Sequence, residues 1–235
     1  MLRYKYLPVD GSFKEPFDQK GALSVIRDGT IKFSHANEFN DPFDCYQEVD
    51  LNKLSKSFSE NEKFYKNIGD ELRLTPAQRI IEKPKQRKKL ENEFFSNLAE
   101  IFNNQIGICS LSRNPLNLLM WAHYATSHFG FVVEFSIPSL LDSDCHCLVP
   151  FPVKYNNEKP IITHYKCFKE HFLTKSLDWE YEKEERVIDL NRGHGIHPYD
   201  RKKILKSVIA GMRMSDTDFS ASFIHRFTLF LITDA

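Results

Sequence analysis

The segment 51–104 constrains the fold most, because its character differs from that of the chain on either side. It is rich in Lys, Glu, Asn and Gln and poor in β-branched residues. Its apolar residues recur at helical spacing, at Leu90, Phe94, Phe95, Leu98, Ile101 and Phe102. Thr75-Pro76 is typical of a helix start, and Pro84 is expected to interrupt the helix. The segment therefore predicts a helical insertion at about 51–104.

Short strand-like segments lie on both sides of this insertion. We expect strands at 2–7, 30–34, 106–112, 131–136, 148–155, 186–190, 204–211 and 223–232. We expect helices at 17–27, 116–127 and 161–178, and a mobile Gly-rich loop at 191–198. Strands alternate with helices early and follow one another late, which indicates an α+β fold with a mixed, mostly antiparallel sheet. A chain of 235 residues fits one such domain, spanning 1–235.

The charge balance excludes a protein that attracts polyanions over its whole surface. Lys and Arg total 32 and Asp and Glu total 32, so the formal net charge is zero. Any contact with nucleic acid or an acidic partner must use a local patch, and KPKQRKK at 83–89 is either such a patch or a solvated helix face. No apolar run approaches the ~18 residues of a membrane span, so we expect a cytoplasmic protein without a membrane partner.

The five cysteines are expected to be reduced thiols. Their number is odd and their spacing irregular, in a chain long enough to fold without disulfides. Cys145-His146-Cys147 lacks a second pair of ligands at zinc-site spacing, so we expect no metal.

Two short polar segments are candidates for a functional site. WEYEKEER at 179–186 places four carboxylates directly before apolar Val187-Ile188, and FNDPFD at 39–44 is a turn whose acceptors could shape a polar site. In a strand, Glu182, Glu184 and Arg186 would share one face, so that Arg186 could restrain one acid while the other acts. A solvated, charged edge strand is the alternative interpretation of the same acids.

The helix expected at 116–127 carries two further candidates. His123 could be a buried, hydrogen-bonded residue, or it could face a cleft and hold a ribose hydroxyl or a phosphate. Tyr124 could stack on a planar ligand ring.

Several motifs together resemble bacterial domain-of-unknown-function family 2971. They are YKY at 4–6, FNDPFD at 39–44, LMWAHYATSHFGFVVEF at 119–135, VKY at 153–155, Lys175 and WEYEKEER at 179–186. The order of elements is also similar to the ADP-ribosyltransferase fold, including the branch that modifies DNA. That similarity implies an enzyme that uses NAD as a substrate, and it is an analogy of fold.

The analogy assigns roles residue by residue. Ser110-Leu111-Ser112 resembles the Ser-Thr-Ser strand end of the arginine-modifying subgroup, and Glu182-Lys183-Glu184 resembles its Glu-x-Glu pair. It implies Glu184 as the catalytic acid, Glu182 as its partner and His123 as a further catalytic residue. The residues expected to bind NAD are Lys5, Tyr6, Ser110, Ser112, Tyr124 and Arg186. Lys5 stands where the subgroup has Arg, and the spacing from Ser112 to Glu182 is longer than the analogy leads us to expect.

Three functions remain open from the sequence. The first is an ADP-ribosyltransferase-like toxin or anti-phage effector that modifies nucleic acid or protein and has a cognate inhibitor or defence-system partner. The second is a metal-independent nuclease in which His123 is the base and Lys175 or Arg186 neutralises phosphate. The third is a non-catalytic binding module whose helical insertion docks a partner.

Overall fold

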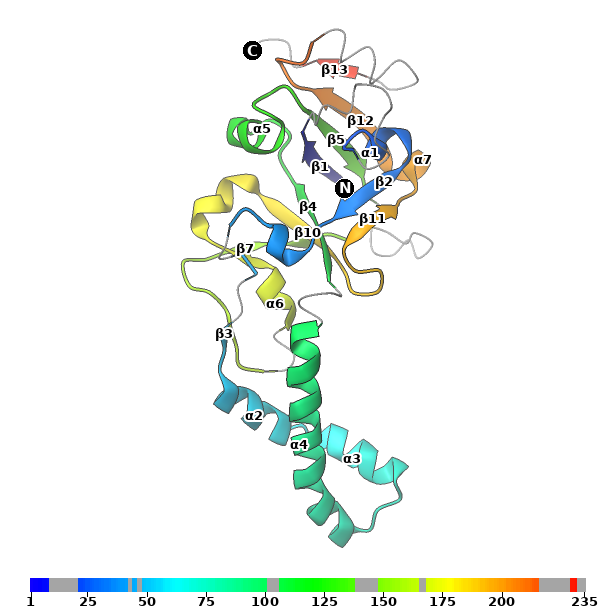
Figure 1. Ribbon diagram of the computed structural model, residues 1–235, viewed down its shortest axis with the longest axis vertical. Coiled ribbons are helices and arrows are strands. Elements are labelled where there is room, and N and C mark those ends of the chain that lie inside the picture. Colours follow the sequence, from blue (N-terminus) through cyan, green and yellow to red (C-terminus); the bar gives the residue numbers. More distant parts are fainter. Residues whose placement is uncertain are drawn as a thin grey trace.

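A seven-stranded sheet forms the body of the molecule, and a group of helices projects from it (Figure 1). The computed structural model describes residues 1–8, 21–41, 44–45, 48–100, 106–137, 148–164, 168–215 and 229–231. The strand order is β13-β12-β5-β1-β4-β10-β6. Every neighbouring pair in it is antiparallel except β12 and β13. The expected α+β fold with a mostly antiparallel sheet is confirmed.

Most of the expected strands are present with small changes of boundary. The sheet comprises β1 (Leu2–Leu7), β4 (Gly107–Ser112), β5 (Phe131–Ser136), β6 (Phe151–Pro152), β10 (Glu184–Asp189), β12 (Leu205–Ala210) and β13 (Leu229–Leu231). The remaining strands pair in twos: β2 (Thr30–Phe33) with β11 (Gly195–Pro198), β3 (Glu48–Val49) with β8 (Ile161–Ile162), and β7 (Lys154–Tyr155) with β9 (Thr174–Lys175). The rest of the strand expected at 223–232 lies outside the described residues.

Three expectations about secondary structure are wrong. The segment 161–178 is not one helix but β8, the short helix α6 (Phe168–Phe172), β9 and the start of the 3-10 helix η3 (Leu177–Glu182). Paired β-branched Ile161-Ile162 favours a strand there. The expected loop at 191–198 contains β11, because Gly195 to Pro198 pair with β2. Residue 204 ends a short helix, α7 (Arg201–Ile204), before β12 begins.

The segment predicted as a helical insertion contains three helices within the described range. They are α2 (Leu51–Ser59), α3 (Glu62–Glu71) and α4 (Pro76–Glu100). Asp50 caps α2 by accepting from Lys53 N, and Thr75 and Gln78 cap α4 reciprocally through their side chains. The expected interruption at Pro84 is wrong, because α4 continues through it. Proline costs a helix one backbone hydrogen bond but does not always end it.

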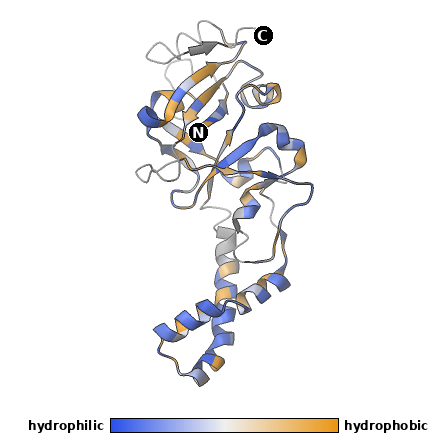
Figure 2. Ribbon diagram, turned by 180° about the vertical axis from the view of Figure 1, so that it is seen from behind, coloured by the Kyte–Doolittle hydropathy of each residue, from blue (hydrophilic) through white to orange (hydrophobic). Residues whose placement is uncertain are grey.

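The helical arm, α2 to α4, is mostly hydrophilic along its length, whereas the sheet is mostly hydrophobic (Figure 2). Leu54 and Phe58 of α2 are buried with Ile106 and Ile162 at the base of the arm. Phe58 meets Phe94 of α4 edge to face, with ring centroids 5.1 Å apart. Burial of these apolar groups fixes the arm to the body. Within the described part of the chain, no helix is both long and apolar enough to cross a membrane.

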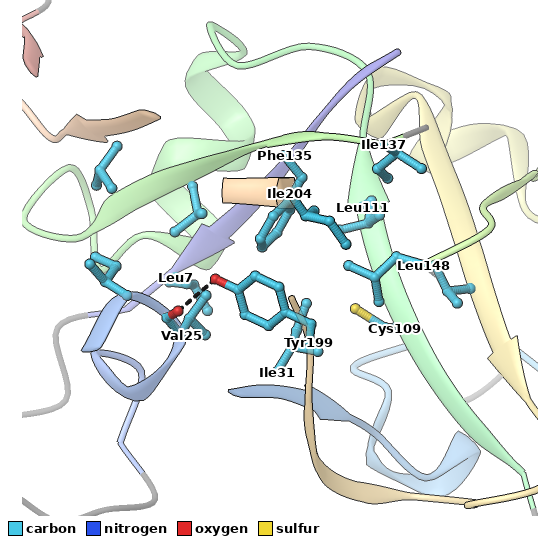
Figure 3. Close-up of a cluster of buried hydrophobic side chains, with 14 of the residues drawn as sticks. Leu7, Val25, Ile31, Cys109, Leu111, Phe135, Ile137, Leu148, Tyr199 and Ile204 are labelled. Atoms are coloured by element: carbon cyan, nitrogen blue, oxygen red, sulfur yellow. Dashed lines mark hydrogen bonds between the residues drawn. The ribbon is translucent and has the colours of Figure 1, made fainter. Parts of the chain in front are cut away.

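The main core lies on the face of the sheet that is covered by the α1 helix (Ser24–Arg27), β2 and α7. Phe135 of β5, Leu111 of β4 and Ile204 of α7 pack around Tyr199, whose hydroxyl donates to Val25 O over 2.6 Å (Figure 3). A helix was expected at 17–27. In the described residues it begins only at Ser24 and ends at Arg27. The helix expected at 116–127 is likewise the shorter α5 (Leu118–Tyr124). Its Met120 and Trp121 pack with Tyr6 of β1, whose side chain points to the opposite face of the sheet from that of Leu7.

Gly107 provides a test of how closely β4 approaches the 191–195 turn. A Cβ at Gly107 would lie 2.0 Å from Gly193 O, which is a backbone atom that cannot rotate away. We expect Gly107→Ala to lower the free energy of unfolding by about 2–3 kcal/mol in a denaturant titration. Gly69→Ala in α3 is the matched control, since its Cβ meets only the movable end of Arg79. A loss in the control as large as that at Gly107 would contradict this account.

Candidate functional site

A cavity of about 120 Å³, called here the first cavity, lies where β1, β4 and β10 meet α5 and the 39–44 segment. Its lining comprises Tyr4, Lys5, Tyr6, Phe39, Asn40, Asp44, Ser110, Leu111, Ser112, Met120, Tyr124, Lys175, Glu182, Glu184 and Arg186. Asn40 is exposed and Tyr4 and Lys5 are half-buried, whereas the acids are buried. The first cavity therefore opens to solvent at one end and has buried, charged side chains at the other.

Strand register brings the predicted residues of three strands together. Glu184 and Arg186 of β10 stand opposite Ser112 and Ser110 of β4. On the other side of β4, Ser112 stands opposite Tyr4 of β1. Because β4 lies between β1 and β10, segments more than a hundred residues apart in sequence line one cavity.

Glu182 reaches the same cavity from outside the strand, so the expectation that it shares a strand face with Glu184 and Arg186 is wrong. It ends η3, and Lys183 turns the chain in the left-handed conformation, at φ 46°, before β10 begins at Glu184. Ser112 Oγ donates to Glu182 O over 2.7 Å, and Asn117 Nδ2 donates to Tyr181 O over 3.0 Å. The ends of β4 and the start of α5 therefore hold the turn in place.

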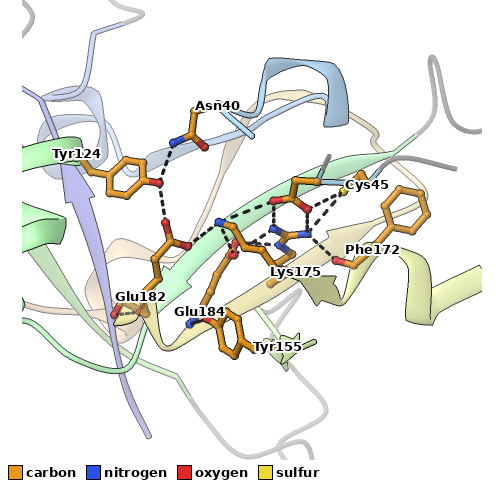
Figure 4. A network of polar contacts seen from close by, with 11 residues as sticks. Asn40, Cys45, Tyr124, Tyr155, Phe172, Lys175, Glu182 and Glu184 are labelled. Carbon is orange, nitrogen blue, oxygen red and sulfur yellow. Dashed lines mark hydrogen bonds and ion pairs between the residues drawn. The ribbon is translucent and has the colours of Figure 1, made fainter. Parts of the chain in front are cut away.

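Lys175 of β9 is the hub of the ionic network in Figure 4. Its Nζ lies 2.6 Å from Glu182 Oε2, 3.2 Å from Glu184 Oε2 and 3.7 Å from Asp44 Oδ2. Burial would lower the pKa of Lys175, but Glu184 and Glu182 outweigh burial and raise it. Lys175 therefore stays charged and links the two glutamates.

Arg186 holds the opposite side of Glu184. The side chain of Arg186 is fully buried, and its guanidinium donates two hydrogen bonds to Glu184 and two to Asp44. A fifth bond goes to Phe172 O over 2.8 Å, and the ring of Phe39 lies 5.0 Å from its Cζ. The rigid fork of arginine suits such paired, bidentate contacts.

The two glutamates consequently have opposite electrostatic situations. Burial would raise the pKa of Glu184, but Arg186 and Lys175 hold it at about 2. Burial raises the pKa of Glu182, and Lys175 offsets this only in part while Glu184 adds to it. Glu184 is thus held in its ionised form by its bonds, and Glu182 is the acid of the pair that binds a proton more readily.

Tyr124 of α5 completes the surroundings of Glu182. Its hydroxyl donates to Glu182 Oε1 over 2.6 Å and accepts from Asn40 Nδ2 over 3.1 Å. Burial and the hydrogen bond to Glu182 raise the pKa of Tyr124, so its hydroxyl stays protonated as a donor. Each oxygen of Glu182 therefore has one donor, from Tyr124 and from Lys175, and the carboxylate is fixed at the cavity wall.

Three of the four acids after Trp179 are buried and do not form a solvated edge, whereas Glu180 is exposed. Only 3% of Glu182, 4% of Glu184 and 5% of Glu185 is exposed. Glu185 points away from the network and is paired with Arg3 of β1. The charges of the three buried acids are therefore neutralised by Lys175, Arg186 and Arg3.

Eight of the nine predicted site residues line the first cavity. They are Lys5, Tyr6, Ser110, Ser112, Tyr124, Glu182, Glu184 and Arg186. His123 does not line the cavity: it is exposed on α5, and its ring centroid lies 6.5 Å from that of Tyr181. The helix turns the side chains of neighbouring residues about 100° apart, so Tyr124 faces inward and His123 does not.

Residue-by-residue prediction missed part of the network. Asp44 and Asn40 were expected only to shape a polar loop, Lys175 was assigned only under the nuclease alternative, and Tyr155 was not considered. Tyr155 Oη lies 2.6 Å from the backbone nitrogen of Glu184, and it belongs to the VKY motif of the family resemblance. The motifs FNDPFD and VKY were thus the signal for these residues.

Among the described residues, no group of three His, Cys, Asp or Glu side chains is arranged to hold a metal ion. Cys145-His146-Cys147, where zinc was considered, lies outside the described residues.

The pKa of Glu184 predicts how stability depends on pH. A carboxyl whose pKa falls from 4.5 to about 2 on folding contributes stability above pH 4.5 and loses it as the pH falls toward 2. We expect wild-type protein to lose roughly 3 kcal/mol of unfolding free energy across this window through Glu184 alone. Denaturant titrations at several pH values should show a shallower acid limb for Glu184→Gln. The exposed Glu180→Gln should keep the wild-type slope, and an equal slope in Glu184→Gln would contradict the assignment.

Comparison with known proteins gives one match. No curated protein and no solved structure matches the chain, so the similarity to the ADP-ribosyltransferase fold remains a prediction. The matched residues run from within α5 to β10, and they include Lys175, Glu182, Glu184 and Arg186 of the ionic network but not Asp44. Residues 120–187 match the sequence model of the family described as Protein of unknown function (DUF2971), which supports the family resemblance seen in the motifs.

Proposed function

We propose that the protein is an NAD-dependent ADP-ribosyltransferase-like enzyme whose reaction takes place in the first cavity. One observation carries the proposal: a buried carboxylate, Glu182, lines a small cavity with both oxygens fixed, next to a second carboxylate that is neutralised. Transfer from NAD breaks the bond between the nicotinamide nitrogen and ribose C1. Positive charge develops on the ribose, and a fixed carboxylate in a dry site stabilises it.

The first cavity is open to solvent at its mouth, where Asn40 is exposed. Its volume of about 120 Å³ is slightly below the ~150 Å³ of an apolar cavity that holds benzene, so it receives the inner part of a planar ring whose outer part remains at the mouth. The ring of Tyr124 and the side chain of Met120 line it together with the polar groups. A nicotinamide ring could therefore enter while the rest of the dinucleotide lies outside.

The fold analogy implies Glu184 as the catalytic acid, but the contacts of Glu182 suit that role better. Glu184 accepts from Arg186 with both oxygens and from Lys175, so a substrate would have to displace one of these. Glu182 has one protein donor on each oxygen and retains lone pairs for a ribose hydroxyl. The proposal therefore gives Glu182 the charge-stabilising role and Glu184 the role of orienting Lys175.

A nucleophile from the acceptor then attacks ribose C1, and nicotinamide leaves. The balanced reaction converts NAD and a protonated acceptor into the ADP-ribosylated acceptor, nicotinamide and a proton. Glu182 can take up that proton, since burial raises its pKa. Lys5 lines the cavity, and its ammonium group donates to the carbonyl of Ser110 over 3.2 Å. An ammonium group has three donors, so Lys5 can also contact an anionic part of the substrate.

The nuclease alternative has less geometric support. Its base, His123, is exposed and outside the cavity lining. Its phosphate-neutralising candidates, Lys175 and Arg186, are already held by three buried carboxylates. A phosphate approaching them would meet the net negative charge of Asp44, Glu182 and Glu184.

The proposal is tested by incubating the purified protein with NAD and measuring free nicotinamide, with and without mixed nucleic acid or protein acceptors. We expect nicotinamide release above the spontaneous rate, and a rise in the melting temperature with millimolar NAD, because a ligand of the native state stabilises it. Absence of both the release and the shift, with every acceptor, would overturn the proposal.

A further inference from the structure

A second cavity, of about 260 Å³, neighbours the first and has no role in the reaction proposed above. Lys175 lines both cavities. Asp41 and His171 at its floor are buried, while Asn156, Asn157 and Glu158 at its rim are exposed. Its volume is about twice that of the first cavity, so it admits more than a single small ring.

Trp179 supplies an aromatic wall to this second cavity. The indole is half-buried, and Lys175 Nζ lies 4.9 Å from its ring centre. Aromatic side chains stack on nucleobases of any type, and such stacking is worth about 1–3 kcal/mol per base. A planar ring is therefore a suitable occupant beside Trp179.

The rim offers groups that recognise a base and a sugar. The side-chain amides of Asn156 and Asn157 each present a donor and an acceptor, as the edge of a base requires. Carboxylates of Glu158 and Asp178 are acceptors for the hydroxyls of a ribose, in the way that acidic residues bind ribose in dinucleotide sites.

Charge narrows the class of ligand. The lining of the second cavity contains three carboxylates, those of Asp41, Glu158 and Asp178, and two ammonium groups, those of Lys159 and Lys175. Lys175 is already paired with Glu182 and Glu184. The remaining negative charge repels the phosphate chain of a nucleic acid. A cationic ligand against Trp179 would in turn meet the ammonium of Lys175. An uncharged nucleoside avoids both conflicts.

From these contacts we propose that the second cavity binds the adenosine half of NAD. This inference rests on the proposed function, in which the nicotinamide end enters the first cavity. Lys175, the residue that lines both cavities, then stands between the two rings. The substrate class of the site is thus a dinucleotide, held by both of its ends.

The inference is tested with ADP-ribose, which carries adenosine and pyrophosphate but no nicotinamide. The chain has two tryptophans, and Trp121 is buried in a different cluster, so it gives a constant background to the fluorescence of Trp179. We expect ADP-ribose and adenosine to quench tryptophan fluorescence saturably. If neither ADP-ribose nor adenosine quenches the fluorescence at millimolar concentration, the inference is overturned. Quenching by arginine-rich peptides but by neither nucleoside ligand would overturn it too, because it would show a site for a cationic ligand.

Calorimetric titration of variants with ADP-ribose locates the binding. We expect Trp179→Leu to weaken binding at least 10-fold and Trp179→Phe to weaken it less, because phenylalanine retains a stacking face. Glu158→Gln, at an exposed rim position that should tolerate it, is expected to weaken binding several-fold through the ribose hydroxyls. Glu180→Gln, an exposed acid of η3 outside the cavity lining, is the matched control. Wild-type affinity in both Trp179→Leu and Glu158→Gln would overturn the inference.

The outcomes separate this inference from the reaction. Binding of ADP-ribose at Trp179 without nicotinamide release supports the second cavity as an adenosine site and overturns the proposed transfer. Nicotinamide release in wild-type protein that shows no response of Trp179 supports the transfer and overturns the adenosine site.

Discussion

Arg186→Met is expected to lower the free energy of unfolding by about 3–5 kcal/mol, measured by denaturant titration at pH 7. Methionine fills a similar volume but leaves Asp44 and Glu184 as buried carboxylates without their bidentate partner. Only Lys175 then faces three acids. A buried charge that loses its partner retains the full cost of its desolvation, and this makes the loss large.

Two controls separate lost charge pairing from lost packing. Arg192→Met removes an arginine that is 39% exposed and bonded to Asp189, so we expect a loss below about 1 kcal/mol. Adding Asp44→Asn and Glu184→Gln to Arg186→Met removes the uncompensated charges and is expected to recover part of the stability. If Arg186→Met and Arg192→Met cost the same, the network contributes little to folding.

Lys175 shows how far the sequence could predict the site. The motif WEYEKEER and the strands expected at 106–112 and 2–7 contain seven of the eight predicted residues that line the first cavity, because charged and apolar patterns mark these segments in the sequence. Lys175 lies in a two-residue strand inside a segment that was expected to be one helix. A strand of this length has no periodicity to detect, and its pairing with β7 is a tertiary contact.

The same limit applies to Glu182 and Asp44. The alternation of side chains in a strand predicted that Glu182 lies on the same strand face as Glu184. Lys183 instead has a positive φ, which is uncommon for lysine, so the strand begins only after it. The turn residues of FNDPFD indicated a polar loop, yet only the fold brings Asp44 to Arg186, 142 residues later in the chain. Sequence patterns therefore predicted which segments meet, while the ion pairs between them required the structure.

Glu182→Gln is expected to reduce the rate of nicotinamide release by about 10²–10³-fold, the effect of removing one electrostatic contact to a charged transition state. Because glutamine keeps the shape and can still bond Tyr124 or Lys175, the main loss is the negative charge. We expect kcat to fall with little change in KM for NAD, since the charge acts on the transition state more than on bound substrate. Steady-state kinetics with a nicotinamide assay measure both constants.

The pH profile tests the same role independently. In wild type, kcat/KM should rise as the pH rises through the elevated pKa of Glu182, because the ionised form is the active one. The hydrogen bond from Tyr124 lowers that pKa, so Tyr124→Phe should move the rise to higher pH. Tyr124→Phe thus reports on a positioning residue, whereas Glu180→Gln should leave the profile unchanged. If Glu182→Gln keeps most of the activity while a folded Glu184→Gln loses it, the acid assigned by the fold analogy is the catalytic one, and the ion pairs of Glu184 must open during the reaction.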